Sequence, residues 1–239
     1  DLPLQLDSSN PEALSRALRI YNGKPIVNSV NGEQKTLDTI LPLCKKYGAA
    51  VVGLALDEHG IPADAEGRFA IAKRIVAAAN AAGIPNEDIY IDCLTLTASA
   101  QQEGAAQTLA ALARCKRELG VRTVLGVSNI SFGLPQRNMV NSTFLAAAFG
   151  CGLDMPILNP KAKRYTDTVN TFRVLNCQDA GAVEFIGEYA DAADPYVAGA
   201  GVAVGVAEAQ PSGAADAAAE CPVAVPEALS DASDAVRDM

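Results

Sequence analysis

Through the first 189 residues, short runs of apolar residues alternate with longer segments in which apolar and polar residues are mixed. Several of the short runs are apolar without alternation, which is typical of strands covered on both faces. In the longer segments apolar residues recur every three or four positions, which predicts helices. This order indicates repeated βα units around a parallel sheet. The predicted strands are Leu2–Asp7, Pro25–Val30, Ala50–Asp57, Ile89–Cys93, Thr123–Asn129 and Met155–Asn159.

Helices are expected between these strands and after the last one. Ser9 and Glu12 have the spacing of a capping box at the start of the first helix. Gly48, Gly83 and Gly120 stand where helix stops need a positive φ. The predicted helices are Pro11–Tyr21, Thr36–Tyr47, Glu66–Ala82, Ala105–Leu119, Asn141–Gly150 and Tyr165–Leu175.

The number of units leaves two architectures open. A closed barrel of this type has eight strands and roughly 250 residues, whereas about six βα units are predicted here. We therefore expect a TIM barrel that is N-terminally incomplete and lacks two units. The alternative is an open, doubly wound sheet, which tolerates five or six strands.

The last fifty residues differ in composition from the rest. Residues 190–239 contain nine acidic residues and one basic residue, Arg237, and are rich in Ala, Gly, Val and Pro. No sustained amphipathic period is present, so we expect a flexible linker or disordered tail. The predicted organisation is one domain over residues 1–189 followed by this tail.

Composition narrows the possible partners. A net charge of −9 argues against nucleic acid, because phosphate binding needs clustered Lys and Arg. Six scattered cysteines without a Cys-x-x-Cys spacing, and a single histidine, argue against a metal site. With 49% hydrophobic residues, no membrane-length apolar run and no secretory leader pattern, we expect a soluble cytoplasmic protein with no membrane partner.

Nearly every predicted strand ends in a polar side chain. The carboxyl ends of parallel strands form the ligand face of such folds, so these side chains predict one pocket. Carboxylates and amides together suit a flat heterocycle with N–H groups beside a carbonyl, such as a 2-amino-pyrimidinone. Each residue can instead form a turn or cap a helix. The polar strand ends are Asp7, Asn28, Asp57, Asp92, Asn129 and Asn159.

Other chemistries have little support. Asp57 precedes Glu58, His59 and Gly60, which is more typical of a surface turn, and a lone histidine there is usually solvated. No Gly-rich phosphate motif is present. Ser128 and Ser131 have no histidine partner in a recognisable motif, which argues against a serine nucleophile.

Four segments carry a resemblance to a known family. They are Leu6–Pro11, Pro25–Glu33, Ile91–Asp92 and above all Gly126–Arg137, which reads GVSNISFGLPQR. Over roughly residues 1–189 the chain resembles the pterin-binding domain of cobalamin-dependent methionine synthase and the methyltetrahydrofolate:corrinoid protein methyltransferases. The resemblance implies a dihydropteroate-synthase-like barrel that this sequence enters at the third strand.

The resemblance also implies the site residues. Asp7, Asn28 and Asp92 match positions that grip the pterin. Asn129 matches an Asn that approaches the methyl-bearing N5, and Arg137 matches an Arg near the ring. Asn129 and Asp92 are then the catalytic candidates.

Two departures from the family pattern stand out. Cys93 occupies a position where Pro is usual, which could shift a loop without removing a donor. An acidic residue that the family's first strand contributes is absent, so weaker pterin binding is expected.

The implied activity is a methyltransferase reaction of one-carbon metabolism and methionine biosynthesis. The methyl group of 5-methyltetrahydrofolate passes to cob(I)alamin carried by another domain or a corrinoid protein, in an SN2-like step that needs a proton or hydrogen bond at N5. Alternatives are a stand-alone methyltransferase serving a corrinoid iron–sulfur protein, and a non-catalytic fragment of the barrel. Dihydropteroate synthase shares the fold but is disfavoured, because no motif of basic residues or histidine that would bind the substrate diphosphate is found late in the sequence.

Overall fold

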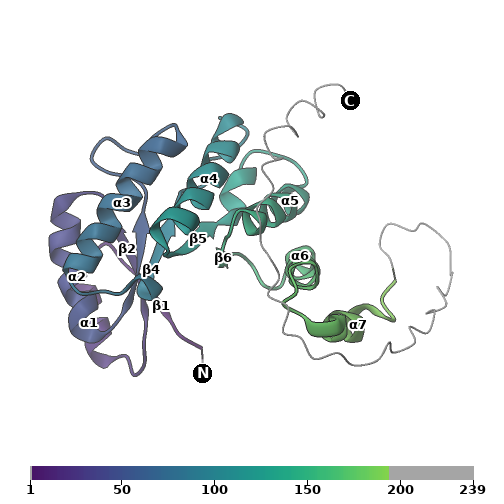
Figure 1. Cartoon of the computed structure of the whole chain (residues 1–239), viewed down its shortest axis with the longest axis horizontal. Helices are drawn as coiled ribbons and strands as arrows, with labels where there is room; N and C mark the ends of the chain where they lie inside the picture. Colours follow the sequence, from purple (N-terminus) through teal and green to yellow (C-terminus); the bar gives the residue numbers. More distant parts are fainter. Residues whose placement is uncertain (1, 194–239) are drawn as a thin grey trace. The chain divides into compact units, whose positions relative to one another are not determined.

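The computed structural model of the chain describes residues 2–193 and contains one parallel sheet (Figure 1). All six predicted strands are present, and they lie in the sheet in the order in which they occur in the sequence. Each pairs with the next in parallel. The strands are β1 (Gln5–Asp7), β2 (Ile26–Asn31), β3 (Ala50–Leu54), β4 (Ile89–Asp92), β5 (Arg122–Gly126) and β6 (Met155–Ile157).

This strand order decides between the two architectures. A doubly wound sheet reverses its order at a switch point, whereas a barrel adds each strand on the same side of the last. The order β1 to β6 without reversal is that of a barrel. Within the described residues β1 and β6 each pair with a single strand, so the barrel is incomplete, as expected.

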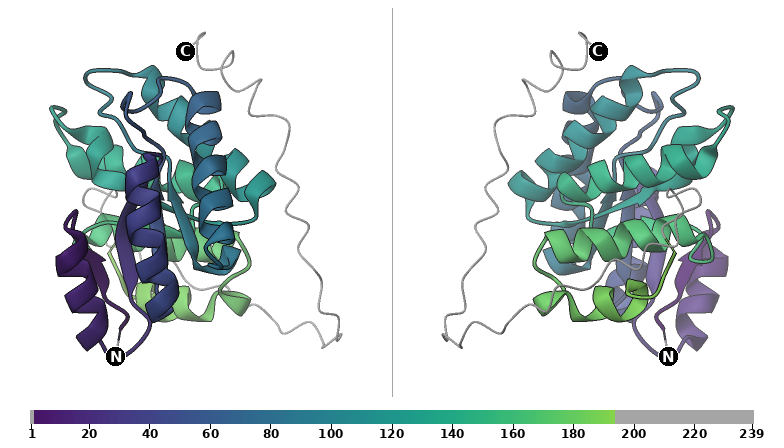
Figure 2. Two further views of the ribbon diagram at one scale, coloured as in Figure 1. Left: turned by 90° about the vertical axis from the view of Figure 1, so that its left-hand side faces the viewer. Right: turned by 90° about the vertical axis from the view of Figure 1, so that its right-hand side faces the viewer.

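The predicted helices are confirmed, with ends that differ by a few residues. The first three lie side by side on the outer face of the sheet, as the left view of Figure 2 shows. The helices are α1 (Pro11–Ile20), α2 (Gln34–Tyr47), α3 (Ala65–Ala81), α4 (Glu103–Arg114), α5 (Arg137–Gly150), α6 (Lys163–Leu175) and α7 (Val183–Tyr189).

The helix ends confirm one prediction and correct another. Gly48, Gly83 and Gly120 have φ values of +66°, +86° and +61°. The predicted capping box at Ser9 is wrong, because the N-cap is Asn10, whose Oδ1 accepts hydrogen bonds from the backbone N–H groups of Glu12 and Ala13. Asn10 stands directly before Pro11 at the first helical position, which favours this start.

Several strands are shorter than predicted. β3 ends at Leu54, so Asp57 lies beyond it, and β6 ends at Ile157, before Asn159. β5 ends at Gly126 and is followed by the 3₁₀ helix η3 (Val127–Ser131), so Asn129 is not a strand residue. Asp57 and Asn159 form local hydrogen bonds instead of pairing with a neighbouring strand: the N–H of Asp57 donates to the carbonyl oxygen of Gly60, and Oδ1 of Asn159 accepts from the N–H of Lys161.

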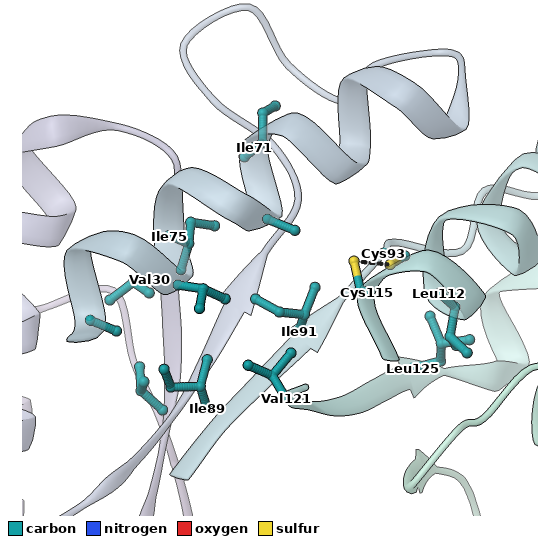
Figure 3. Close-up of a cluster of buried hydrophobic side chains, with 14 of the residues drawn as sticks. Val30, Ile71, Ile75, Ile89, Ile91, Cys93, Leu112, Cys115, Val121 and Leu125 are labelled. Atoms are coloured by element: carbon teal, nitrogen blue, oxygen red, sulfur yellow. Dashed lines mark hydrogen bonds between the residues drawn. The ribbon is translucent and has the colours of Figure 1, made fainter. Parts of the chain in front are cut away.

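The core lies between the sheet and its helices. Figure 3 shows Ile75 of α3 between the helix and the sheet, near Val30 of β2 and Ile91 of β4, and all three side chains are buried. A Cβ atom built on Gly53 of β3 lies 2.7 Å from Cγ2 of Ile75, so only glycine lets α3 pack this closely. The alternate residues of the strands therefore face away from the helices, toward the inner face of the barrel.

The chain divides into two compact units, one ending at Phe172 and one beginning at Arg173. The described part of the second contains the end of α6, a short 3₁₀ turn and α7, which was not predicted. Asp179 caps the start of α7 by accepting from the N–H groups of Glu184 and Phe185. The domain boundary after residue 189 stays a prediction, and the expected tail lies almost wholly outside the described residues. No helix among the described residues is long and apolar enough to span a membrane.

Candidate functional site

Strand register places three of the predicted site residues on the inner face. Asp7 is opposite Asn28, Asn28 is opposite Val52, and Asp92 is opposite Leu54. Val52 and Leu54 are two residues apart on β3, so they point to the same face, and their partners point there with them. Asp7, Asn28 and Asp92 therefore share the inner face. Asp7 and Asp92 end their strands, whereas the prediction that Asn28 ends a strand is wrong, because β2 continues to Asn31.

Asp7 and Asn28 are in direct contact. The Nδ2 group of Asn28 donates a hydrogen bond of 3.3 Å to Oδ2 of Asp7. Both residues line a cavity of about 510 Å³, a size within the range of small-molecule sites. The pair leaves the Oδ1 atom of Asn28 as an acceptor and the other oxygen of Asp7 as a second acceptor.

Asn31 and Glu33 also line this cavity and were not predicted as site residues. The backbone N–H of Glu33 donates to Oδ1 of Asn31 at 3.0 Å, and Nδ2 of Asn31 donates to Oε1 of Glu33 at 3.1 Å. The register of β2 and β3 shifts between Asn28 and Val30, so Asn31 is opposite Leu54. This shift brings Asn31 to the same face as Asn28, which simple alternation from the sequence excludes.

Asp92 is the buried carboxylate of the site, with 8% of its surface exposed. Burial raises the pKa of its carboxyl group from 3.8 to about 6, and a hydrogen bond from the backbone N–H of Leu94 opposes that rise. This bond to Oδ1 is 2.7 Å long. Its other oxygen, Oδ2, has no hydrogen-bond partner among residues 2–193, so it can accept from a ligand.

Asn28 on β2 and Asp92 on β4 are separated by the intervening strand β3. Strands lie about 5 Å apart and rise about 3.3 Å per residue. Asn28 and Asp92 are two strands and two residues apart, so their Cα atoms are separated by roughly 12 Å. Side chains that extend inward from both positions can reach the two edges of one bicyclic ring. Asp92 is not among the residues that line the cavity beside Asp7 and Asn28.

Asn129 lies above the end of β5. A Cβ atom built on Gly126 comes within 3.1 Å of Nδ2 of Asn129, so the amide occupies the space that a larger residue at 126 would fill. Asn129 is exposed in η3. Its amide is thus available at the carboxyl edge of the sheet, although the residue does not end a strand.

Arg137, the first residue of α5, holds the loop that carries Asn129. Its Nε–H donates to Oγ of Ser131 at 3.0 Å, and Nη2 donates to the carbonyl oxygen of Ser128 at 3.0 Å. Its guanidinium also lies 4.6 Å from the centroid of the Phe132 ring. Direct contact between Arg137 and a ligand stays a prediction.

The remaining polar strand ends form turns. Asp57 accepts from the N–H of His59 at 3.0 Å and from Arg74 at 3.1 Å. Oδ1 of Asn159 accepts from the N–H of Lys161 at 3.0 Å. These two residues therefore do not join the pocket, and His59 is exposed. Among residues 2–193, no group of three or more His, Cys, Asp or Glu side chains could hold a metal ion.

Comparison with known proteins now decides the family. A family model described as pterin binding enzyme matches residues 1–159. The chain belongs to this family. The polar side chains on the inner face thus lie within a pterin-binding domain, and the resemblance inferred from the sequence is confirmed.

Two kinds of relative stand out among the matches. The chain is 35% identical over 171 residues to methionine synthase from Mycobacterium leprae, covering 66% of this chain and 14% of that protein. It is 29% identical over 167 residues to the methylcorrinoid:tetrahydrofolate methyltransferase of Eubacterium limosum, covering 68% of this chain and 61% of that protein. Both relatives are methyltransferases, and this pterin-binding domain is similar to a module of each.

Solved structures agree on the fold. Dihydropteroate synthase from Yersinia pestis superposes with a TM-score of 0.58 at 16% identity, over 74% of this chain and 73% of that one. The enzyme from Xanthomonas albilineans gives a TM-score of 0.60 at 22% identity, over 73% and 68% of the two chains. The predicted dihydropteroate-synthase-like barrel is therefore confirmed, with six of its parallel strands present in this chain.

Proposed function

We propose that the chain binds 5-methyltetrahydrofolate and transfers its methyl group to cob(I)alamin held by another domain or a corrinoid protein. The observation that carries this proposal is the sharing of one inner face by Asp7, Asn28 and Asp92 in a pterin-binding domain. The names of both relatives, a methionine synthase and a corrinoid-dependent methyltransferase, support the methyl transfer.

The side chains fit the edges of a pterin ring. A pterin presents an amino group and a ring N–H beside a carbonyl along one edge. The carboxylates of Asp7 and Asp92 accept from such N–H groups, while the amide of Asn28 can donate and accept. Because Asp92 is buried, a hydrogen bond from the ligand to its free oxygen is stronger than the same bond in water.

Methyl transfer requires a change at N5. When the bond between N5 and the methyl carbon breaks, its electron pair stays on N5, and this nitrogen is a poor leaving group unless it gains a proton or hydrogen bond. Cob(I)alamin supplies the nucleophile that takes the methyl group. We assign Asn129 the hydrogen bond to N5, because its amide lies exposed above the carboxyl end of β5.

Asp92 is suited to the proton balance of this step. A carboxyl group with a pKa of about 6 exchanges its proton readily near neutral pH. It can reach N5 only through water or through the ring it binds. In our proposal Asp92 orients the pterin and sets its protonation, while Asn129 stabilises N5 as the methyl departs.

A second reaction has specific support. The relative from Eubacterium limosum is named for transfer from a methylcorrinoid to tetrahydrofolate, the reverse direction. The same residues serve both directions, because one transition state is shared. The direction of transfer and the final methyl acceptor therefore depend on the protein that supplies the corrinoid.

Binding and transfer can be tested separately with the full chain. Calorimetric titration with 5-methyltetrahydrofolate measures binding, and the formation of tetrahydrofolate after addition of free cob(I)alamin measures transfer. We expect both for the unmodified chain, and we expect Asp92→Ala to abolish binding. Asp57→Ala is the matched control, since Asp57 follows a neighbouring strand but is engaged in a turn.

The outcomes separate the alternatives. Binding without transfer would favour a non-catalytic pterin-binding fragment. A folded chain that binds no folate would contradict the proposal. Equal losses in the Asp92 and Asp57 variants would show that the inner face is not the binding site.

A further inference from the structure

Arg68 of α3 is completely buried, with 0% of its surface exposed. Its hydrogen bonds go to neutral groups. Nε donates to the carbonyl oxygen of Pro62 at 2.9 Å, and Nη1 donates to Oγ1 of Thr108 at 2.7 Å. Its Nη2 has no partner among the described residues. Burying a guanidinium among neutral acceptors is costly, so packing alone does not explain this residue.

The other acceptors of Arg68 lie in the turn that follows Asp92. Nη1 lies 3.1 Å from the carbonyl oxygen of Cys93 and 3.1 Å from that of Leu94. These are the two residues directly after the site carboxylate. One buried cation therefore holds both peptide groups between β4 and α4.

Leu94 has an unusual backbone conformation. Its φ is +61°, which is rare for a leucine and is retained only where the surroundings impose it. In this conformation its N–H donates to Oδ1 of Asp92 at 2.7 Å, while its carbonyl oxygen lies 3.1 Å from both Nη1 of Arg68 and the hydroxyl of Thr108. The N–H of Leu94 is thus bonded to Asp92, while its carbonyl oxygen is bonded on the other side, in the interior beside α3.

We propose that Arg68 is a positioning residue that keeps Leu94 in its left-handed conformation, so that the Leu94 amide stays on the Asp92 carboxylate. The catalytic consequence rests on the proposed function, but the arrangement itself does not. Without Arg68, Leu94 relaxes toward a common φ and its N–H leaves Asp92. The carboxylate then loses a fixed orientation and the hydrogen bond that favours its ionised form.

Few charged groups surround Asp92. The neighbouring strands present Leu54 and Val124 beside it, neither of which titrates. On the helix side the titratable and charged groups are the Cys93 thiol, which lies 3.9 Å from Sγ of Cys115, Arg68 itself, and the Asp64 carboxylate, which favours the charged form of Arg68. Burial and the Leu94 hydrogen bond account for the shifted pKa of Asp92, so Arg68 acts through the backbone.

The test is a carboxyl ¹³C NMR titration of Asp92 in the full chain without folate. Arg68→Met keeps the length of the side chain and removes its donors. We expect the pKa of Asp92 to rise by about one unit, because loss of a hydrogen bond to the charged form raises a carboxyl pKa. Arg68→Lys, which can donate to one carbonyl, is expected to restore part of the shift.

Two further variants make the result decisive. Arg74→Met removes another arginine of α3, one that pairs with Asp57, and is expected to leave the Asp92 titration unchanged. Thr108→Val removes an acceptor of Arg68 together with the hydroxyl that lies 3.1 Å from the carbonyl oxygen of Leu94, so it loosens the same turn if Arg68→Met does not fold. We expect a smaller shift in the same direction.

The result can be read whether or not the chain binds folate. An unchanged Asp92 titration in the folded Arg68 and Thr108 variants would overturn the positioning role. A shifted titration in a chain that binds no folate would instead overturn the proposed function alone. If the positioning role and the proposed function are both correct, the pH midpoint of folate binding rises in Arg68→Met together with the pKa of Asp92.

Discussion

The side chain of Asn28 on β2 donates a hydrogen bond of 3.3 Å to the carboxylate of Asp7 on β1. Register makes the two residues direct neighbours across the strands. An acceptor-only carboxylate is thus paired with a group that both donates and accepts, and the pair lines the cavity. Each side chain fixes the orientation of the other before a ligand arrives.

Replacing the amide with a second carboxylate tests this pairing. In Asn28→Asp two like charges face each other, so we expect folate binding at pH 7 to weaken roughly tenfold or more. Lowering the pH should recover part of the affinity, because protonation of one carboxylate restores a donor. Calorimetric titration at two pH values measures this. Asn22→Asp, in an exposed loop, is the control, and a loss that does not respond to pH would contradict the argument.

The repeat of helix, glycine and strand allowed most of the fold to be predicted. Apolar runs and helix stops are local signals, and all six strands and the helices between them formed where these signals occur. Asp7 and Asp92 were recognisable because each ends a strand, whereas Asn28 lies inside β2, which continues to Asn31. The strand ends at Asp57 and Asn159 gave the same signal, yet hydrogen bonds within their own turns engage these side chains.

Two features of the site depend on non-local geometry. Asn31 is three residues from Asn28, so strict alternation places it on the opposite face, and only the register shift against β3 brings it to the cavity. Asn129 reaches the inner face because β5 ends at Gly126 and η3 turns back over the strand end. Neither the shift nor the turn has a signal in the hydrophobic pattern.

Asn129→Ala tests the assignment of N5 stabilisation. The amide is exposed and contributes little to folding, so the variant should fold normally. We expect methyl transfer to slow by roughly 100-fold, as for loss of a group that assists proton transfer, with a much smaller effect on folate affinity. Single-turnover rates and equilibrium titration separate the two effects. Asn159→Ala is the control, and equal losses of rate and affinity in Asn129→Ala would contradict this role.

Gly126→Ala tests the same amide without removing it. The added methyl group would lie 3.1 Å from Nδ2 and 3.7 Å from Cγ of Asn129, so the amide must move by a few tenths of an ångström. Since catalytic hydrogen bonds depend on position, we expect a decrease in transfer rate of roughly tenfold. Gly150→Ala at the end of α5 meets no atom within 4 Å and serves as the control. A full rate in Gly126→Ala would show that the position of Asn129 is not critical.

Asp92 links the site to stability, and the sign of its effect can be derived. Its folded pKa of about 6 lies above the ordinary 3.8, so between these values the folded chain retains a proton that the unfolded chain has lost. Stability therefore falls as pH rises through this window and stays low above it, by about 3 kcal/mol at most.

The variant Asp92→Asn tests this effect, because it retains an oxygen that can accept from Leu94 and carries no charge. We expect it to be more stable than the unmodified chain at pH 7, with a flatter pH dependence between about pH 4 and pH 6. Urea unfolding across this range measures both, with the exposed Glu87→Gln as control. Greater stability together with lost folate binding would identify Asp92 as a residue kept for function at the expense of stability, whereas an unchanged pH dependence would show that its burial does not disfavour the charge.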